Sequence, residues 1–374
     1  MEKLKSLNVL FLTNIPSPYR VDFFNEFGKY CSLTVTFEGK KATDRDEKWQ
    51  ADNVYNFKAV YLKGIRVSND KFLCFDIIKI LNKKWDAIII GGYSTPTSIL
   101  AIEYLKLKKQ KFFIEADGGF IGNDNWIKYK IKKHLISAAS WWLSSGKETT
   151  KYLTYYGAKQ ENCYLFPFTS LKEADLKKAV ELREYDKNEI KQRLNINEGK
   201  ILLAIGQFIP RKGFDILIEA IKNLPNNVGV YIIGGKPPEE YKKLKTLYQL
   251  NNLHFVGFKR KTELAYYYAM ADVFVLPTRE DIWGLVVNEA MAFGLPIITT
   301  DKCIAGLELV DDKNGVIIPV NNVYALSNAI NYILNNDTEK MGRVSIDRIK
   351  QYTIEKMAKI HSKILKIVNF KEFE

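Results

Sequence analysis

The chain has 374 residues, which is long for one core and sufficient for two domains of about 100–200 residues each. Hydrophobic residues make up 47% of it and there are only 11 prolines, which excludes disordered, collagen-like and coiled-coil proteins. Of the net charge of +13, residues 1–170 contribute +9, from 26 Lys and Arg against 17 Asp and Glu. Such a surplus attracts nucleic acid, an anionic membrane surface or a phosphorylated substrate, and charge alone does not choose among them.

Cysteines and apolar runs indicate the compartment. The four cysteines lie far apart without a C-x-x-C pair, and the three histidines stand elsewhere, so neither a zinc site nor a disulfide framework is indicated. No apolar run approaches the roughly 18 residues of a spanning helix, and the first residues lack a signal-peptide pattern. We expect a cytoplasmic protein, neither secreted nor integral to a membrane, that can still sit at the inner face of the cell membrane.

The first half alternates predicted strands with predicted helices. In chain order we expect a strand at 7–13, a loop at 14–18, a helix at 19–30, strands at 31–37 and 86–91, a helix at 97–109, a strand at 111–116, a helix from 125 and a strand at 140–144. This alternation indicates a parallel sheet that is covered on both faces.

The same rhythm returns near residue 200. We expect strands at 201–206, 228–235, 253–258, 272–277, 296–300 and 315–320, and helices at 213–223, 238–249, 261–270 and from Trp283. The fold class is therefore α/β with two Rossmann-like domains, residues 1–168 and 169–345, joined by a linker around 165–172 and followed by a helical segment, 346–374. In such sheets ligands bind at the carboxyl ends of the strands, so we expect function in a cleft lined by those loops.

The strongest pattern is the segment TREDIWGLVVNEAMAFGLP. Asp281 and Glu289 are eight residues apart, and a helix beginning near Trp283 would leave the N–H groups of Trp283, Gly284 and Leu285 as unpaired donors. These donors and the helix dipole favour a phosphate, and the two carboxylates can accept hydrogen bonds from sugar hydroxyls. Gly284 would let a ligand approach the backbone closely. An ordinary helix with Asp281 as its N-cap explains the same residues equally well.

A second pattern is GQFIPRKG, in which a predicted strand ends at Gly206 and two cations, Arg211 and Lys212, precede the next helix. Cations at the carboxyl edge of a sheet can hold a pyrophosphate, Arg through its fork and Lys as a point charge. A solvated loop is the commoner explanation of an isolated Arg-Lys pair. Because the same domain also carries the helix with Asp281 and Glu289, the solvated loop is no longer the favoured explanation here.

These residues carry a family resemblance. GQFIPRKGFDILIEAI, VGVYIIGG, LHFVGF and EDIWGLVVNEAMAFGLPIITTD followed by Asn314-Gly315 resemble the C-terminal half of retaining glycosyltransferases of family 4, which have the two-Rossmann GT-B fold. The motifs cover about residues 198–330. More loosely, NIPSPYRVDFF, EADGGF and YLFPFTSL resemble bacterial members that assemble capsule, exopolysaccharide or lipopolysaccharide. The resemblance implies that the last helix crosses back to the first domain.

The resemblance also implies roles for the donor residues. The family's Glu-x7-Glu pair falls on Asp281, which is one methylene shorter, and on Glu289; the first acid would contact the donor sugar and the second the nucleotide ribose. Arg211 and Lys212 match the phosphate-neutralising pair of the family. Trp283 stands where relatives often have Phe, in the wall around the sugar.

The implied reaction moves a sugar from a nucleotide-diphosphate sugar, with UDP favoured, to a hydroxyl of a glycan or lipid-linked acceptor with retention. The base would be held by main chain near Phe258, and no metal or separate cofactor is expected because the cations and the helix start would neutralise the diphosphate. Two alternatives stay open. One is a GT-B-fold sugar-nucleotide epimerase or hydrolase, and the other is a basic module that binds membrane or nucleic acid, for which no nucleic-acid signature is visible.

On the same resemblance the first domain binds the acceptor. After the strand that ends near Glu115, relatives often have His where this chain has Asp117. Asp117 can hydrogen-bond an acceptor hydroxyl, assist its deprotonation, or cap the turn made by the two glycines that follow it. Glu115 is a weaker candidate for that role. Tyr19 and Arg20 are candidates to line the cleft, or they simply start a helix.

Two basic segments, WIKYKIKKHLI (126–136) and YLKLKKQK (104–111), can lie in an anionic lipid interface. An ordinary amphipathic helix with a solvated lysine face is the alternative for each segment. Asp44-Arg45-Asp46 has the D-x-D spacing of metal-dependent glycosyltransferases, but it lies far from the donor motifs in a charged stretch that we interpret as a solvated loop.

Overall fold

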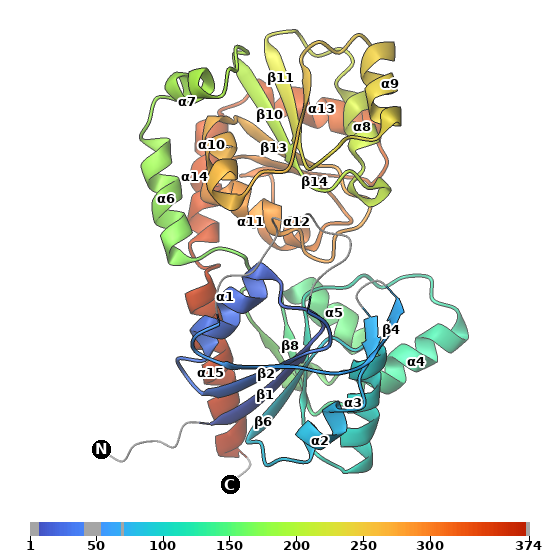
Figure 1. The fold of residues 1–374 in the computed structure, drawn as a ribbon. Helices are drawn as coiled ribbons and strands as arrows, with labels where there is room; N and C mark the ends of the chain where they lie inside the picture. Colours follow the sequence, from blue (N-terminus) through green and yellow to red (C-terminus); the bar gives the residue numbers. More distant parts are fainter. Residues whose placement is uncertain (1–6, 41–53, 69–70, 372–374) are drawn as a thin grey trace. The chain divides into compact units, whose positions relative to one another are not determined.

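The computed structural model describes residues 7–40, 54–68 and 71–371. The chain forms two compact units (Figure 1): unit 1 comprises Met1–Thr169 and Ile354–Glu374, and unit 2 comprises Ser170–Thr353. The D-x-D segment, residues 44–46, lies outside the described residues. Within the described ranges, no helix is both long and apolar enough to cross a membrane.

Unit 1 is built on a parallel sheet in the order β3-β2-β1-β6-β7-β8-β9, beside a small antiparallel β4-β5 pair. Its strands are β1 (Asn8–Thr13), β2 (Ser32–Phe37), β3 (Lys58–Tyr61), β4 (Ile65–Ser68), β5 (Lys71–Leu73), β6 (Ala87–Gly91), β7 (Phe113–Ala116), β8 (Trp141–Ser144) and β9 (Cys163–Leu165). Its helices are α1 (Pro18–Phe27), α2 (Ile77–Leu81), α3 (Pro96–Leu107), α4 (Trp126–Ile136), α5 (Lys147–Tyr155), the 3-10 turn η1 (Gln160–Asn162) and α15 (Ile354–Lys371).

The apolar residues of β1 alternate between two covered faces of this sheet. Leu10 and Leu12 belong to a core that includes residues of α3 and α5, while Phe11 contacts the rings of Phe23 and Phe24 on α1. Helix α15 packs against α1 on that second face (Figure 1). A strand buried on both faces reads as a continuous apolar run, which is why LNVLFLT was recognisable from sequence.

Unit 2 contains a second parallel sheet, in the order β12-β11-β10-β13-β14-β15. Its strands are β10 (Lys200–Ile205), β11 (Val228–Ile233), β12 (Leu253–Val256), β13 (Val273–Leu276), β14 (Ile297–Thr300) and β15 (Gly315–Ile318). Its helices are α6 (Glu173–Arg183), α7 (Lys187–Arg193), the 3-10 turn η2 (Pro210–Lys212), α8 (Phe214–Ala220), α9 (Glu239–Leu247), α10 (Lys261–Met270), α11 (Leu285–Ala292), α12 (Ile304–Leu309), α13 (Val323–Leu334) and α14 (Thr338–Ile349).

Helices cover both faces of the second sheet as well. Residues of α8, α9 and α13 share one core with alternate residues of β10 and β11. Phe274 points to the opposite face, where its ring lies 6.0 Å from that of Tyr268 on α10. The prediction of two parallel, Rossmann-like α/β halves is confirmed.

Both sheets have a switch point, where the chain leaves a central strand in one direction and later returns on its other side. In unit 2 this point lies between β10 and β13, which are paired at Leu202 and Val273. The loops that follow these two strands therefore emerge side by side at the same edge, the usual location of a ligand in an open α/β sheet.

Candidate functional site

An acid and two cations meet at the switch point of unit 2. Lys212, at the end of η2 after β10, places its Nζ 2.5 Å from Oδ2 of Asp281, which lies in the loop after β13. Arg211 is farther away, with 3.6 Å between its NH1 and Oδ1 of Asp281, and the same nitrogen donates to the main-chain oxygen of Glu280 at 2.5 Å. The structure thus brings Asp281 to two neighbouring cations, the second of which lies 69 residues before it in the sequence.

The two loops are fastened to each other by contacts that sequence reasoning missed. Two guanidinium nitrogens of Arg279 pair with the Asp215 carboxylate, at 2.5 and 2.9 Å. The main-chain N–H of Arg279 donates to the Arg211 carbonyl at 2.7 Å. Gly213 adopts φ of 67°, and a Cβ there would lie 2.1 Å from the carbonyl oxygen of Pro277. Only glycine fits this left-handed position against another backbone.

The main chain of Asp281 is equally fixed. Its N–H donates to the Lys302 carbonyl at 2.7 Å and its own carbonyl accepts from the Ile304 N–H at 3.2 Å, so Asp281 pairs with Cys303 as an isolated bridge. The Asp281 side chain is largely buried, whereas that of Arg211 is 41% exposed. Lys212 and Asp281 therefore form the rigid part of the group, and Arg211 is its solvent-facing member.

Helix α11 begins two residues later than the sequence predicts, which changes the donors of its first turn. Gly284 is the N-cap residue, with φ of 98°, and Leu285 is the first helical residue. Among the described residues, no hydrogen bond outside the helix reaches the N–H groups of Leu285 or Val286. A Cβ on Gly284 would lie 2.8 Å from Cys303 Sγ, so packing and backbone conformation already require glycine here.

The structure buries the side chain of Trp283, for which the resemblance implies a place in the wall around the sugar; that role stays a prediction. The indole is buried, donates from Nε1 to Oδ1 of Asn288 at 2.8 Å and packs near the ring of Tyr352. A buried indole that has found its hydrogen-bond partner is a core residue.

Glu289 is held by a different set of residues. Its Oε1 accepts from Ser170 Oγ and its Oε2 from the Tyr268 hydroxyl, both at 2.9 Å. Burial raises the pKa of Glu289, against the opposing effects of Lys261 and these two hydrogen bonds. Lys261 also donates to the Ser170 carbonyl at 3.0 Å. The carboxylate is thus oriented before any ligand arrives.

The remaining candidates lie at the ends of β10 and β12. A Cβ on Gly206 would lie 3.4 Å from the Lys212 side chain, so this glycine borders the cation. Gly234, at the end of β11, approaches so closely that its Cβ would meet the Gly206 carbonyl oxygen at 1.8 Å. Phe258 follows β12 in a partly buried loop. All three lie at the carboxyl edge of the sheet, which also carries Lys212.

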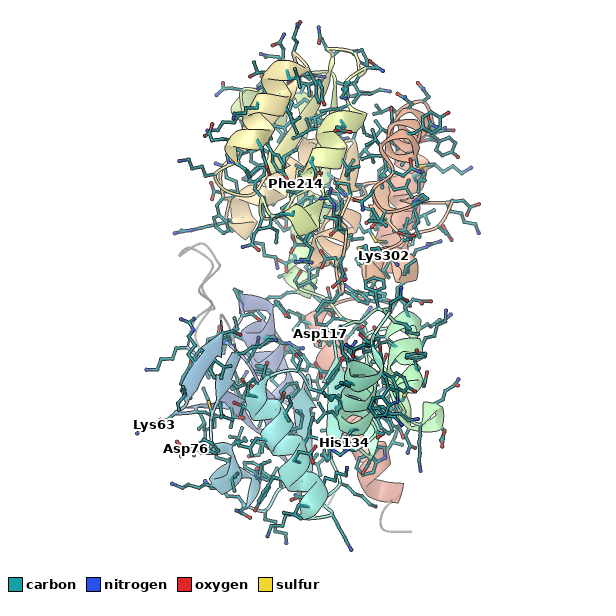
Figure 2. All side chains as sticks on the ribbon, turned by 90° about the vertical axis from the view of Figure 1, so that its right-hand side faces the viewer. Lys63, Asp76, Asp117, His134, Phe214 and Lys302 are labelled. Carbon is teal, nitrogen blue, oxygen red and sulfur yellow. The ribbon has the colours of Figure 1, made fainter. Side chains whose placement is uncertain are left out.

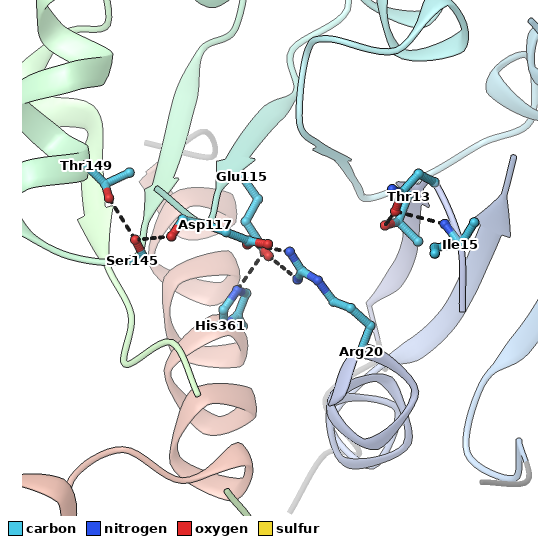
Figure 3. Close-up of polar contacts among 9 residues, drawn as sticks. Thr13, Ile15, Arg20, Glu115, Asp117, Ser145, Thr149 and His361 are labelled. Carbon is cyan, nitrogen blue, oxygen red and sulfur yellow. Dashed lines mark hydrogen bonds and ion pairs between the residues drawn. The ribbon is translucent and has the colours of Figure 1, made fainter. Parts of the chain in front are cut away.

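A second charged group lies in unit 1 and involves three separate segments (Figure 3). Arg20 on α1 donates from NH1 to Glu115 Oε1 and from NH2 to Asp117 Oδ1, both at 2.5 Å. His361 on α15 contacts the other oxygen of Glu115 through Nε2 at 2.9 Å, while its Nδ1 faces the Met357 carbonyl at 2.8 Å. Both ring nitrogens of His361 therefore face oxygen atoms that accept hydrogen bonds.

The two carboxylates share Arg20 but differ in their pKa. Burial by itself would raise the pKa of Glu115, but Arg20 and His361 hold it at about 2. Burial raises the pKa of Asp117; the Arg20 charge opposes that rise and the Glu115 charge adds to it. Glu115 is inaccessible, whereas the Asp117 side chain is 21% exposed. Of the two, Asp117 is the more basic carboxylate and the one that solvent can reach.

Asp117 does not cap the glycine turn with its side chain, which is directed to Arg20. Its main-chain oxygen accepts from Ser145 Oγ at 2.8 Å (Figure 3). Arg20 is buried, and its guanidinium lies beside the rings of Tyr19 and Phe168, 5.8 and 5.6 Å from their centroids. Sequence reasoning missed His361, because it lies 246 residues from its partner in a helix that gave no site signal.

No cluster of three or more His, Cys, Asp or Glu side chains suited to a metal ion occurs in the parts of the chain that the structure describes. The two charged groups described above instead contain both cations and carboxylates. In unit 2 the trio carries two positive charges and one negative charge beside the start of a helix, and such an arrangement can bind an anion.

Comparison with known proteins decides the family of unit 2. Residues 186–351 match the family model described as "Glycosyl transferases group 1". Residues 186–351 are a group 1 glycosyl transferase domain. An uncharacterized glycosyltransferase of Methanocaldococcus jannaschii is 32% identical over 176 residues, which is 45% of this chain and 49% of that protein. The lipopolysaccharide glucosyltransferase WaaG of Escherichia coli is 31% identical over 137 residues, 35% of each chain.

Solved structures resemble the chain over nearly its full length. Anabaena HepE in complex with UDP and glucose gives a TM-score of 0.73 at 15% identity, covering 97% of this chain and 99% of that one. WaaG gives 0.68 at 16% identity, with 96% and 99% covered. These likenesses show the fold, GT-B. In sequence, the chain spans about half or less of the length of the curated relatives named here. The glycosyl transferase domain contains Arg211, Lys212, Asp281 and Glu289.

Proposed function

We propose that the protein is a retaining glycosyltransferase that moves a sugar from a nucleotide-diphosphate sugar, with UDP favoured, to a hydroxyl of a glycan or lipid-linked saccharide in bacterial surface polysaccharide biosynthesis. The observation that carries the proposal is the Arg211–Asp281–Lys212 group beside the start of α11, at the switch point of a group 1 glycosyl transferase domain. HepE, which shares the fold, was solved with UDP and glucose, which supports a nucleotide-sugar donor.

The donor diphosphate is proposed to bind between the two cations and the first turn of α11. Lys212 is held by Asp281 and acts as a fixed point charge, while the exposed Arg211 can turn its fork from the Glu280 carbonyl to a phosphate. The N–H groups of Leu285 and Val286 supply further donors on the positive end of the helix dipole. Asp281 is then the acid nearest the sugar, and Glu289 the proposed partner of the ribose hydroxyls.

Bond cleavage is proposed to be driven by charge stabilisation. When the bond between the anomeric carbon and the diphosphate oxygen breaks, negative charge grows on the terminal phosphate, and these donors interact with it more strongly than in the ground state. Cations and helix donors are proposed to act here without a metal ion. A departing phosphate oxygen can take the acceptor proton, which is compatible with retention and requires no dedicated base.

Asp117 is proposed to orient the acceptor hydroxyl or to assist its deprotonation. Its Oδ1 is fixed by Arg20, and among the described residues none bonds to Oδ2. Its raised pKa makes it the better proton acceptor of the two carboxylates, and Glu115 is excluded from that role by its burial. We place the reaction in the cytoplasm, at the inner face of the cell membrane, where a lipid-linked acceptor would be met.

The donor assignment is tested by thermal unfolding with UDP-, GDP-, dTDP- and ADP-sugars. A ligand at 100 times its Kd stabilises the native state by about 2.7 kcal/mol, which raises Tm by several degrees. We expect one nucleotide series to stabilise the wild type and the control Arg343→Ala, whose side chain is exposed on α14. Arg211→Ala should lose most of the shift. Stabilisation by none of the four nucleotides would overturn the proposal.

Transfer itself is tested with the nucleotide sugar that gives the shift. Release of nucleotide that matches sugar transfer to an added glycan one to one is expected. Epimerisation or hydrolysis that proceeds at the same rate with and without an acceptor would favour an epimerase or hydrolase instead.

A further inference from the structure

Helix α4 of unit 1 exposes the apolar side chains that an ordinary surface helix would bury. Trp126 is 72% exposed, Ile127 62% and Ile131 54%, while only Leu135 and Ile136 at its end are buried. Ile127 and Ile131 are four residues apart and so lie on the same face of the helix. Exposed apolar residues in such a group are the feature that marks a contact surface.

This exposure does not come from a loosely attached helix. Asn125 caps α4 by accepting from the Lys128 N–H at 2.9 Å. Asp124, just before the helix, accepts from Lys132 at 2.8 Å and from the Tyr156 hydroxyl at 2.5 Å. The ring of Tyr129 packs against that of Tyr156, 5.7 Å away. These contacts hold one face of α4 to the unit, so that Ile127 and Ile131 face outward.

The surroundings of the exposed residues are basic. Lys130 and Lys133 are exposed on α4, and Lys130 lies 5.7 Å from the Trp126 ring centroid. Helix α3 lies beside α4 (Figure 2), and its Lys106 reaches His134 at 3.3 Å. The end of α3 adds exposed Leu107 between Lys106 and Lys108. Two acids that face α4 are themselves paired: Glu103 of α3 with His134 at 2.6 Å, and Asp124 with Lys128 at 2.9 Å.

We call the exposed face of α4 (Trp126, Ile127, Lys130, Ile131 and Lys133) together with the end of α3 (Lys106 to Lys108) the α3–α4 surface. We propose that this surface binds an anionic lipid bilayer, with Trp126, Ile127 and Ile131 entering the headgroup region. Single apolar side chains separated by lysines suit a lipid interface, in which long cationic side chains reach phosphates while the rings and branched chains insert. A protein partner of matching shape would select a contiguous apolar core instead. The proposal rests on the proposed function in one respect, which is that a lipid-linked acceptor would be met at the membrane. Helix α4 follows directly on the loop that begins at Asp117, the residue proposed to bind the acceptor.

The test is co-sedimentation of the full chain with vesicles, without nucleotide or acceptor. We expect binding to vesicles in which about one lipid in three is phosphatidylglycerol and the rest are phosphatidylcholine. Binding to vesicles of phosphatidylcholine alone should be at least tenfold weaker. Binding should fall as salt rises, because exposed charges are screened. Equal binding to both vesicle types, or none to either, would overturn the proposal.

Two variants separate the apolar and the charged contributions. Trp126→Ser/Ile127→Ser/Ile131→Ser should weaken vesicle binding at least tenfold, whereas Leu247→Ser/Tyr324→Ser, which removes exposed apolar residues of unit 2, should not. Unchanged binding by the triple variant would refute the surface.

Charge reversal gives the second comparison. Lys130→Glu/Lys133→Glu should abolish the preference for anionic vesicles, and Lys313→Glu/Lys340→Glu, with exposed lysines of unit 2, should retain it. Tight binding to single-stranded RNA that the same lysine changes abolish, with vesicle binding unaffected, would assign the surface to nucleic acid and overturn the proposal. Each variant should keep the nucleotide-induced rise in Tm, so failure of the membrane surface is distinguishable from failure of the donor site.

Discussion

Glu115→Gln should reveal how much the buried charge group stabilises unit 1. The carboxylate is fully buried between Arg20 and His361, and its pKa falls from 4.5 to about 2 in the native state. This lowering of the Glu115 pKa corresponds to about 3 kcal/mol of stability. Because the change to Gln also leaves Arg20 and His361 without their shared anion, we expect a loss of about 3–5 kcal/mol at pH 7.

The sign of the pH dependence follows from the direction of the shift. The unfolded chain takes up a proton at Glu115 as pH falls below 4.5, while the native state resists until about pH 2. The contribution of Glu115 is therefore complete above pH 4.5 and is lost as pH falls toward 2. Between pH 5 and pH 3 the wild type should lose about 2 kcal/mol more than the variant, which has no carboxyl to titrate at this position.

Urea unfolding followed by tryptophan fluorescence is a suitable assay, because all tryptophans except Trp283 precede residue 170. Wild type and Glu115→Gln are also compared in an Asp117→Asn background, which removes the neighbouring carboxyl. The raised pKa of Asp117 gives stability a pH dependence opposite in sign to that of Glu115. Glu240→Gln, at an exposed site on α9, is the control. A difference below about 1 kcal/mol at pH 7, or one that stays constant from pH 5 to pH 3, would show that Glu115 is not the charge that Arg20 and His361 stabilise.

Three further outcomes are expected. Glu289→Ala should weaken nucleotide-sugar binding in calorimetry, because its carboxylate is preoriented by two hydrogen bonds; equal donor affinity before and after the change would contradict its role. Asp117→Ala should leave donor affinity intact and lower kcat by about 10²-fold; a change confined to donor binding would count against it. Gly213→Ala should cost about 2 kcal/mol or more in urea unfolding, because φ is 67° and the new Cβ would meet the Pro277 carbonyl, whereas Gly122→Ala, with open space around it, should be nearly neutral.

The strands that could be predicted from sequence are those buried on both faces. LNVLFLT and ILLAIG are continuous apolar runs because helices cover them from both sides, and their bounds came out within one or two residues. The antiparallel β4–β5 pair was not predicted, because its strands have only four and three residues and the apolar–polar alternation of IRVS is too short to indicate a strand. The edge strand β9, Cys163–Leu165, was not predicted and reaches the first residue of the predicted linker, because it is held by pairing with β8 rather than by burial.

The candidate site divides in the same way. Arg211, Lys212 and Asp281 could be predicted to meet because two loops at one sheet edge follow from the strand order alone. The ion pair of Arg279 and Asp215 that fastens them could not be predicted, because a contact between a loop and the first turn of α8, 64 residues apart, leaves no local pattern. The start of α11 was misplaced by two residues, because the left-handed backbone at Gly284, and not the acid before it, ends the loop.

The two charged groups share an arrangement that bears on how each can act. In each, one member is buried and fully paired, Lys212 with Asp281 in unit 2 and Glu115 with Arg20 and His361 in unit 1, and a second member is more exposed and less fully bound. Buried pairs hold their geometry because breaking one leaves an uncompensated charge in a poorly solvated place. The exposed members, Arg211 and Asp117, can exchange a protein contact for a ligand contact at much lower cost. A site assembled in this way needs little reorganisation when charge develops, which is the property that lets fixed cations and oriented carboxylates lower a barrier.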